Sequence, residues 1–423
     1  MLKSLTFVAF ALLILSPNSF SQEASVSLPA YLKQFPKESA HKLVSGKQVV
    51  GKTSFRWKAD SVNRLRFIEE SEIKLTLFKK SQSITTKLDV VTNEKIEIQS
   101  FDFTMKTNEA AIDMKGERIG NNLRLKVGQA GKTQTKDVTI QEPTVMSATL
   151  RPYLLMRGLP EQKSKWDAFV LEPSALTTVP LVIDVTKVKG AKPTWDVLVR
   201  YLDHKLVSIV DSVGNLMSEK SDFAGLPVEA VPLSTGEDIQ KLKLDGTKED
   251  LVEKAKVSFP KIPNPRTIKK LSVKIDGIDL SRFELKRHRQ TIQGNVLSIE
   301  VEKTPVKSMA VQSLVGRKEF DKYLQGDTAT PVYDPVIQKQ AREIVGAEND
   351  LWKRAELIQK FVFTTLQKIP TISVPNALEV LATKRGDCNE HAVLFTALAR
   401  AAGVPTRTVV GLVYSDRALR SAS

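Results

Sequence analysis

The stretch Ile73-Lys74-Leu75-Thr76-Leu77 alternates apolar and polar side chains, and the same pattern recurs through the first half of the chain. Successive side chains of a strand point to opposite faces, so alternation at period two predicts strands with one buried face. Similar runs occupy residues 96–105 and 123–127, with glycine-containing turns at 120–122 and 214–215. Residues 22–235 are therefore predicted to form an antiparallel β-rich domain, shaped as a half-barrel or a sandwich.

The alternation is interrupted after residue 235. A proline-rich stretch, Phe259-Pro260-Lys261-Ile262-Pro263-Asn264-Pro265, lies in the interruption, and alternation resumes at residues 271–275 and 296–301. Asp276-Gly277 is a hairpin signal between these two runs. Residues 236–325 are predicted to be a small second β module.

Helical signals dominate residues 326–423. Asp334 is a good N-cap, Pro335 suits the first helical position and Gly346 is a good stop. A second helix is expected from Asp350, with apolar side chains at helical spacing through Leu366. The whole chain is thus predicted to be α+β, with its helices at the C-terminal end.

The composition of the chain excludes several kinds of cofactor and metal site. The chain of 423 residues carries a formal charge of +15, one cysteine and four histidines. A single cysteine excludes an intramolecular disulfide, a cysteine-rich zinc site and an iron–sulfur cluster. We expect no cofactor and no metal ion. The densest basic segments, residues 269–274 and 286–289, are interpreted as a solvated basic face. Aromatic residues make up only 6% of the chain and do not interleave with the basic ones, so nucleic acid is not expected as a partner.

Residues 1–21 are typical of a signal peptide. Lys3 supplies the positive start, an uncharged apolar run follows to Leu15, and Ser19-Phe20-Ser21 gives small residues around a cleavage point. No later stretch is long and apolar enough for a transmembrane helix. We expect an exported protein, periplasmic or extracellular. Its β-rich domain either binds an envelope partner or ligand on its open face or acts as a scaffold.

The motif Gly386-Asp387-Cys388-Asn389-Glu390-His391-Ala392 carries the candidate chemistry. Asp387 and Glu390 have the spacing of a capping box, which places Cys388 at the first position of a helix that stops at Gly403. Backbone N–H groups and the helix dipole favour the thiolate there, whereas the two carboxylates oppose it. Cys388 is the candidate catalytic residue.

Four segments closely resemble, in order, the core of bacterial transglutaminase-like proteins: residues 376–381, 385–392, 398–407 and 410–411. The resemblance covers residues 334–414 and implies a papain-like fold, in which the cysteine helix packs on an antiparallel sheet. It implies that Cys388 attacks an amide of a protein or peptide substrate, releases an amine and forms a thioester. An amine would accept the acyl group in a transferase, and water would accept it in a cysteine peptidase or amidase. A histidine acts as the base and an acidic residue orients it.

The sequence departs from the family pattern after the strand expected at residues 406–413. The family's histidine and acidic residue follow that strand, but the last histidine here is His391, on the cysteine helix itself. His391 either substitutes as base or serves in packing or in bridging to solvent, and His41, His204 and His288 lie in the β-rich part. Three readings stay open: an acyltransferase with an incomplete core, a peptidase, or a noncatalytic envelope-binding protein. We expect the incomplete core to be loosely packed or prone to aggregation, beside a normally folded β region.

Overall fold

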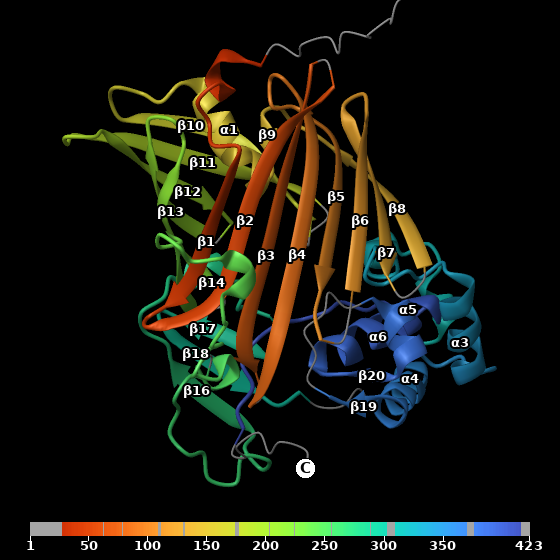
Figure 1. Ribbon diagram of the computed structural model, residues 1–423. Helices are drawn as coiled ribbons and strands as arrows, with labels where there is room; N and C mark the ends of the chain where they lie inside the picture. Colours follow the sequence, from red (N-terminus) through yellow and green to blue (C-terminus); the bar gives the residue numbers. More distant parts are fainter. Residues whose placement is uncertain are drawn as a thin grey trace, which may run out of the picture.

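The computed structural model describes residues 28–415, apart from 62, 78, 109–110, 130–131, 174–176, 203, 224, 255, 288, 303–308 and 370–375. The predicted signal peptide and His288 lie outside these residues. The fold is α+β, as predicted, with a large N-terminal sheet and helices at the C-terminal end (Figure 1). No helix among the described residues is long and apolar enough to cross a membrane.

One sheet of fifteen strands contains every strand from β1 to β15. Its order is β8-β7-β6-β5-β4-β3-β2-β1-β15-β14-β13-β12-β11-β10-β9. All neighbours are antiparallel except β9 and β10. The first eight strands are β1 (Glu38–Ser45), β2 (Gln48–Ser61), β3 (Arg64–Leu77), β4 (Lys80–Asn93), β5 (Ile98–Lys106), β6 (Ala111–Ile119), β7 (Asn122–Gln129) and β8 (Lys132–Thr139). The others are β9 (Thr144–Val145), β10 (Ser164–Glu172), β11 (Thr177–Val188), β12 (Thr194–Tyr201), β13 (His204–Asp211), β14 (Leu216–Phe223) and β15 (Leu226–Pro232).

The sheet is two meanders joined at one seam. Strands β1 to β8 form one meander and β10 to β15 the other, and β1 pairs with β15 between them. The sheet curves but stays open, with β8 and β9 as its ends (Figure 1). Of the two shapes predicted from the alternation, the half-barrel is the one observed.

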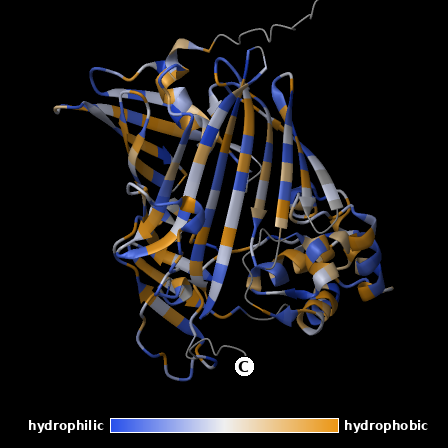
Figure 2. Ribbon diagram, viewed as in Figure 1, coloured by the Kyte–Doolittle hydropathy of each residue, from blue (hydrophilic) through white to orange (hydrophobic). Residues whose placement is uncertain are grey.

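The concave face of the sheet holds the main core. Residues directly opposite each other on paired strands share a face, and this face presents Phe55, Phe67 and Leu88 on β2, β3 and β4. Figure 2 shows the resulting alternation of hydrophobic and hydrophilic residues along the strands. Helix α1 (Ser147–Arg157) and the short helix η1 (Ala30–Leu32) pack over the face, and α1 buries Tyr153 and Leu154. Each such side chain contributes roughly 1.5–3 kcal/mol by leaving water.

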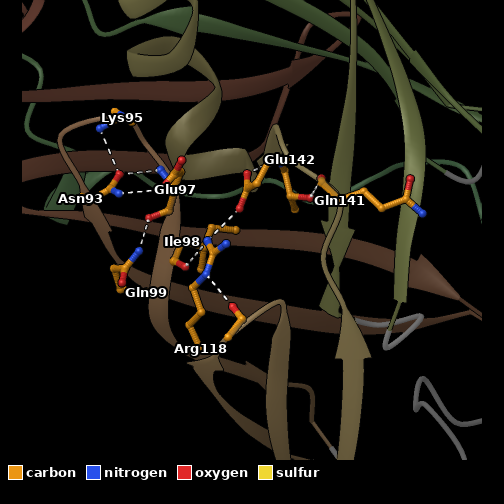
Figure 3. A network of polar contacts seen from close by, with 10 residues as sticks. Asn93, Lys95, Glu97, Ile98, Gln99, Arg118, Gln141 and Glu142 are labelled. Atoms are coloured by element: carbon orange, nitrogen blue, oxygen red, sulfur yellow. Dashed lines mark hydrogen bonds and ion pairs between the residues drawn. The ribbon is translucent and has the colours of Figure 1, made fainter.

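A polar network fixes the chain where it enters β9 and α1 (Figure 3). Arg118, on β6, donates to the carbonyl oxygens of Gly120 and Ile98 and pairs with Glu142 at 2.7 Å. Glu142 also accepts the backbone N–H of Thr144. The network therefore ties the β6–β7 hairpin to the segment that carries α1.

A smaller sheet follows the large one. It consists of β16 (Lys270–Lys274), β18 (Val296–Glu300) and β17 (Gln290–Gln293) in that order, all antiparallel, and β16 and β18 fall where the resumed alternation predicted strands. The short helices η3 (Ile239–Lys241) and α2 (Leu251–Lys254) precede these strands and contact β1 and β3 of the large sheet, and η4 (Leu280–Arg282) lies between β16 and β17 in the sequence. Residues 237–250 run along the ends of β1, β2 and β3, with contacts such as Lys42 to Glu237 at 3.0 Å. The domain boundaries drawn from the sequence stay a prediction.

The C-terminal helices pack around a separate core. They are α3 (Pro335–Val345), α4 (Leu351–Thr365), α5 (Ala377–Thr383) and α6 (Cys388–Ala401), preceded by the short helices η5 (Val311–Leu314) and η6 (Lys318–Tyr323). Asp334 and Asp350 cap α3 and α4 as predicted, by accepting the N–H groups of Val336 and Lys353. Two short parallel strands, β19 (Gln367–Lys368) and β20 (Arg385–Gly386), lead into α6. The buried core is formed by Ile337, Ala341, Ile358, Val362, Leu394, Ala397 and Leu398.

Candidate functional site

Cys388 is the first residue of α6, and its side chain is exposed. The carboxylate of Asp387 accepts the N–H of Asn389 at 2.9 Å, and Glu390 Oε2 accepts the N–H of Asp387 at 2.8 Å. This is the capping box predicted from the sequence, and it satisfies N–H groups that the helix itself leaves without partners. The thiol is therefore presented at the surface by a firmly defined helix start.

Because Gly386 has no side chain, the segment that leads into α6 can pass close to Glu390. Its φ is +155°, and a Cβ added there would lie 2.2 Å from the Cβ of Glu390. The Glu390 side chain is only 4% exposed because it lies against this glycine while it caps the helix. The short pairing of β20 with β19 holds the same turn from the other side.

The electrostatic balance at Cys388 favours the neutral thiol. Partial burial raises the pKa of the thiol above its ordinary value, and the carboxylate of Asp387 raises it further. The backbone N–H groups of Cys388 and Asn389 lower the pKa, and Glu390 adds a smaller increase. Of the opposing influences on Cys388 recognised in the sequence, those that disfavour the thiolate are therefore the stronger. The helix start alone does not activate the nucleophile.

His391 is turned toward the backbone of its own helix. Its Nδ1 lies 2.6 Å from the carbonyl oxygen of Asp387, which can only accept a hydrogen bond, so Nδ1 donates. In the neutral ring Nε2 then carries no proton. This atom is buried and has no hydrogen-bond partner among the described residues. The hydrogen bond of His391 is therefore made to the backbone at the start of its own helix.

The other described histidines belong to the large sheet. His41, on β1, lies 3.0 Å from the carbonyl oxygen of Leu216 through its Nε2, and the ring of His204 packs against Tyr201. Neither contact involves α6. No group of three or more histidine, cysteine, aspartate or glutamate side chains is placed to hold a metal ion in the part of the chain that the structure describes.

The strand predicted at residues 406–413 does not form, and that prediction is wrong. A strand needs a neighbouring strand for its backbone hydrogen bonds, and no described segment pairs with this one. The segment is instead held at its ends, where Thr406 donates to the carbonyl oxygen of Tyr323 and Tyr414 accepts the N–H of Ile262. Between them Val410 is 95% exposed and Val413 is 90% exposed.

Two arginines secure the far end of α6, and sequence reasoning missed both. Arg354, on α4, donates to the carbonyl oxygens of Ala402 and Glu348. Arg400 donates to the carbonyl oxygens of Thr406 and Gln325. An arginine near a helix C-terminus is a recognisable signal, but its distant carbonyl partners are defined only by the fold.

Comparison with known families and structures adds to this geometry. Residues 338–422 match the model of the transglutaminase-like superfamily, which confirms the resemblance found in the C-terminal part of the sequence. A search of curated proteins found no match.

Three solved structures overlap parts of the chain. A β-barrel-like protein of a domain family of unknown function from Brucella abortus is 11% identical, with a TM-score of 0.36 over 47% of this chain and 95% of that one. A proposed cysteine protease from Cytophaga hutchinsonii is 15% identical, with a TM-score of 0.21 over 27% of this chain and 48% of that one. A further protein of an uncharacterised family, from Pseudomonas aeruginosa, is 12% identical, with a TM-score of 0.24 over 38% of this chain and 87% of that one. Overlap at these scores does not establish a shared fold.

Proposed function

We propose, from the match of residues 338–422 to the transglutaminase-like superfamily, that Cys388 is the nucleophile of an acyl transfer on amides of proteins or peptides. The sulfur bonds to the amide carbon, the carbon–nitrogen bond breaks, and the thiol proton leaves with the released amine. An amine then takes the acyl group from the thioester. The observation that carries this proposal is an exposed thiol at the capped start of α6, within the matched segment.

The residues around Cys388 position the sulfur more than they activate it. The capping box and Gly386 fix the first turn of α6, so the direction of the Cα–Cβ bond is defined before substrate arrives. The N–H groups of Cys388 and Asn389 favour negative charge on the sulfur. The nearby carboxylates disfavour it, so the proposal requires a base or a cation brought to Cys388 by another segment or another molecule.

A noncatalytic role is the second candidate, and the raised pKa of Cys388 favours it. In that case the helical region is a degenerate core and the half-barrel binds an envelope partner. A cysteine peptidase or amidase shares the first chemical step with the transferase and differs only in using water as the acceptor. Product analysis separates these two reactions, whereas the reactivity of the thiol separates both from the noncatalytic role.

The first experiment measures the rate of alkylation of Cys388 against pH, with Cys388→Ser as the control for background labelling. The same proteins are then incubated with a glutamine-containing peptide and a fluorescent primary amine. Incorporation of the amine that is lost in Cys388→Ser supports the transferase. Cleavage or deamidation without incorporation supports the hydrolase. No turnover, with a thiol that titrates above the free-cysteine pKa of about 8.5, refutes catalysis by this chain.

We also propose that the protein is exported, because residues 1–21 have the charge, apolar run and small residues of a signal peptide. The N-terminal sequence of the protein recovered from the envelope fraction tests this. Cleavage close to Ser21 supports export, and an intact Met1 in the cytoplasmic fraction contradicts it.

A further inference from the structure

Residues 256–301, which contain the small sheet, expose many apolar side chains. Among the described residues of this stretch only Ile262 and Leu297 are buried, and neither belongs to the cores of the half-barrel or the helical region. The large apolar side chains that the stretch exposes are Val257, Phe259, Ile278, Phe283, Val296 and Val301. The large sheet is much longer, yet its described residues expose only Ile119, Val188, Leu202 and Met217. A high density of exposed apolar side chains is typical of an interaction surface.

The same stretch is strongly basic. It contains ten lysines and arginines and four aspartates and glutamates, so it holds +6 of the chain's formal charge of +15. Three of the four carboxylates form ion pairs within the stretch: Glu300 with Lys270, Asp276 with Lys274, and Glu284 with Arg287. Five exposed cations have no ion-pair partner among the described residues: Lys261, Arg266, Lys269, Lys286 and Arg289. The surplus positive charge is therefore available to a partner.

Cations and apolar side chains meet at one end of the small sheet. The N–H of Val301, just after β18, donates to the carbonyl oxygen of Lys269, just before β16, at 2.9 Å. The N–H of Glu300 donates to the carbonyl oxygen of Arg289, just before β17, also at 2.9 Å. These bonds place the three chain segments side by side. The small sheet lies at the opposite end of the half-barrel from α1, so neither α1 nor η1 covers it (Figure 1).

The loop that leads into β17 adds to this end. Arg287 and Gln290 exchange backbone hydrogen bonds of 3.1 and 2.7 Å, and the Gln290 side chain donates to the carbonyl oxygen of Leu285 at 3.5 Å. Lys286 and Phe283 are thereby held near the start of β17. The Phe283 side chain is 49% exposed, and that of Val301 is 66% exposed. We refer to this group as the basic end of the small sheet: Lys269, Lys286, Arg289, Phe283 and Val301.

We propose that the basic end of the small sheet docks on a bilayer surface that contains anionic phospholipid. Exposed cations alone fit a solvated face, which is the interpretation drawn from the sequence. The apolar side chains of Phe283 and Val301 beside them are better accommodated at the boundary between lipid headgroups and acyl chains, where they leave water. Anionic headgroups complement the unpaired cations, each of which strengthens binding about fivefold near such a surface.

A bilayer fits both halves of this group, the charged and the apolar. Nucleic acid would engage the cations, but it would gain little from the aliphatic side chain of Val301, because bases stack on aromatic rings. The ionic part of the docking should weaken with salt, since the screening length falls from about 10 Å at 0.1 M to about 3 Å at 1 M. The proposal concerns the small sheet and is independent of chemistry at Cys388.

Co-sedimentation of the full chain with vesicles tests the proposal, with phosphatidylcholine alone or mixed with phosphatidylserine, at 0.1 M salt. The charge variant combines Lys269→Gln, Lys286→Gln and Arg289→Gln, and it should bind the anionic vesicles up to about a hundredfold more weakly. A control variant removes the same number of exposed charges from the large sheet and its loops, and it should bind as the unmodified protein does. The control substitutions are Lys58→Gln, Lys95→Gln and Lys163→Gln.

The apolar variant combines Phe283→Ser with Val301→Ser and tests whether the two side chains enter the bilayer. It should bind the anionic vesicles roughly tenfold more weakly. Its control is Leu202→Ser, because Leu202 is 67% exposed on the large sheet, and this change should have no effect. The proposal is overturned if the unmodified protein does not bind better when phosphatidylserine is present. It is also overturned if the charge variant or the apolar variant binds as the unmodified protein does.

If either variant does not fold, a measurement of depth in the bilayer decides the question. Phe283→Cys is made in a chain that carries Cys388→Ser, so that a fluorophore labels residue 283 alone. Quenching of this label by lipids with brominated acyl chains supports the proposal. A label at residue 283 that is quenched no more than one introduced with Leu202→Cys refutes it.

Discussion

Replacing Gly386 with alanine tests whether the entry to α6 defines the site. The new Cβ would lie 2.2 Å from Glu390 Cβ, 2.4 Å from its Cγ and 3.0 Å from its Cδ, so the Glu390 side chain must move. Its hydrogen bond to the Asp387 N–H, which is half of the capping box, would then be lost. Loss of a cap costs about 1 kcal/mol, and a strained φ for a residue with a side chain costs roughly 1–3 kcal/mol. We expect the helical region to lose about 3 kcal/mol of stability.

The assay is urea unfolding followed by alkylation of Cys388, because the thiol reports on the helical region alone. In Gly386→Ala the urea concentration at the midpoint of unfolding should fall. Because the helix start is already disturbed in the folded variant, the rate of Cys388 alkylation at neutral pH should change little on unfolding. Gly411→Ala is the control, because a Cβ at Gly411 meets no atom within 4 Å. If Gly386→Ala and Gly411→Ala unfold at the same urea concentration as the unmodified protein, the close approach of Gly386 to Glu390 does not define the site.

Two other substitutions and one protease digestion test the region. Asp387→Asn keeps a side-chain oxygen for the Asn389 N–H but removes a charge that raises the pKa of Cys388. The rate of Cys388 alkylation at pH 7 should therefore rise roughly threefold. The control Asp334→Asn, at the start of α3, should leave that rate unchanged. Arg354→Met leaves the carbonyls of Ala402 and Glu348 without this donor and should cost about 1–3 kcal/mol in thermal unfolding, whereas its exposed neighbour Lys353→Met should have little effect. Chymotrypsin should cut within residues 407–414 before it cuts the large sheet, and equal resistance of the two regions would contradict the expected looseness.

Local patterns were sufficient to predict local structure. The alternation around Leu75 gave strands with the correct buried face, and the spacing of Asp387 and Glu390 gave the first residue of α6. Both depend on neighbours within a few residues. The balance of forces on the Cys388 thiol depends also on how deeply the surrounding chain buries it, and spacing alone does not report that.

Contacts between residues far apart in the chain could not be predicted from the sequence. Glu69 interrupts the apolar face of β3 after Leu65 and Phe67, so a charge on the concave face was visible in principle. Its hydrogen-bond donor, Ser147, lies in α1 far along the chain, and no periodicity links the two residues. The strand expected at 406–413 failed for the related reason that a strand is defined by its partner.

The seam between β1 and β15 has a consequence for how the protein folds. Each meander grows by hairpins between consecutive strands, and β3 and β4 alone share fourteen paired positions. The seam has only four paired positions, between His41–Val44 of β1 and Glu229–Pro232 of β15. These pairs cannot form until both meanders have been synthesised. Contacts of such high sequence separation slow folding because the intervening loop must be ordered first. The joining of β1 to β15 should therefore be the late, rate-limiting event, with each meander a cooperative unit before it.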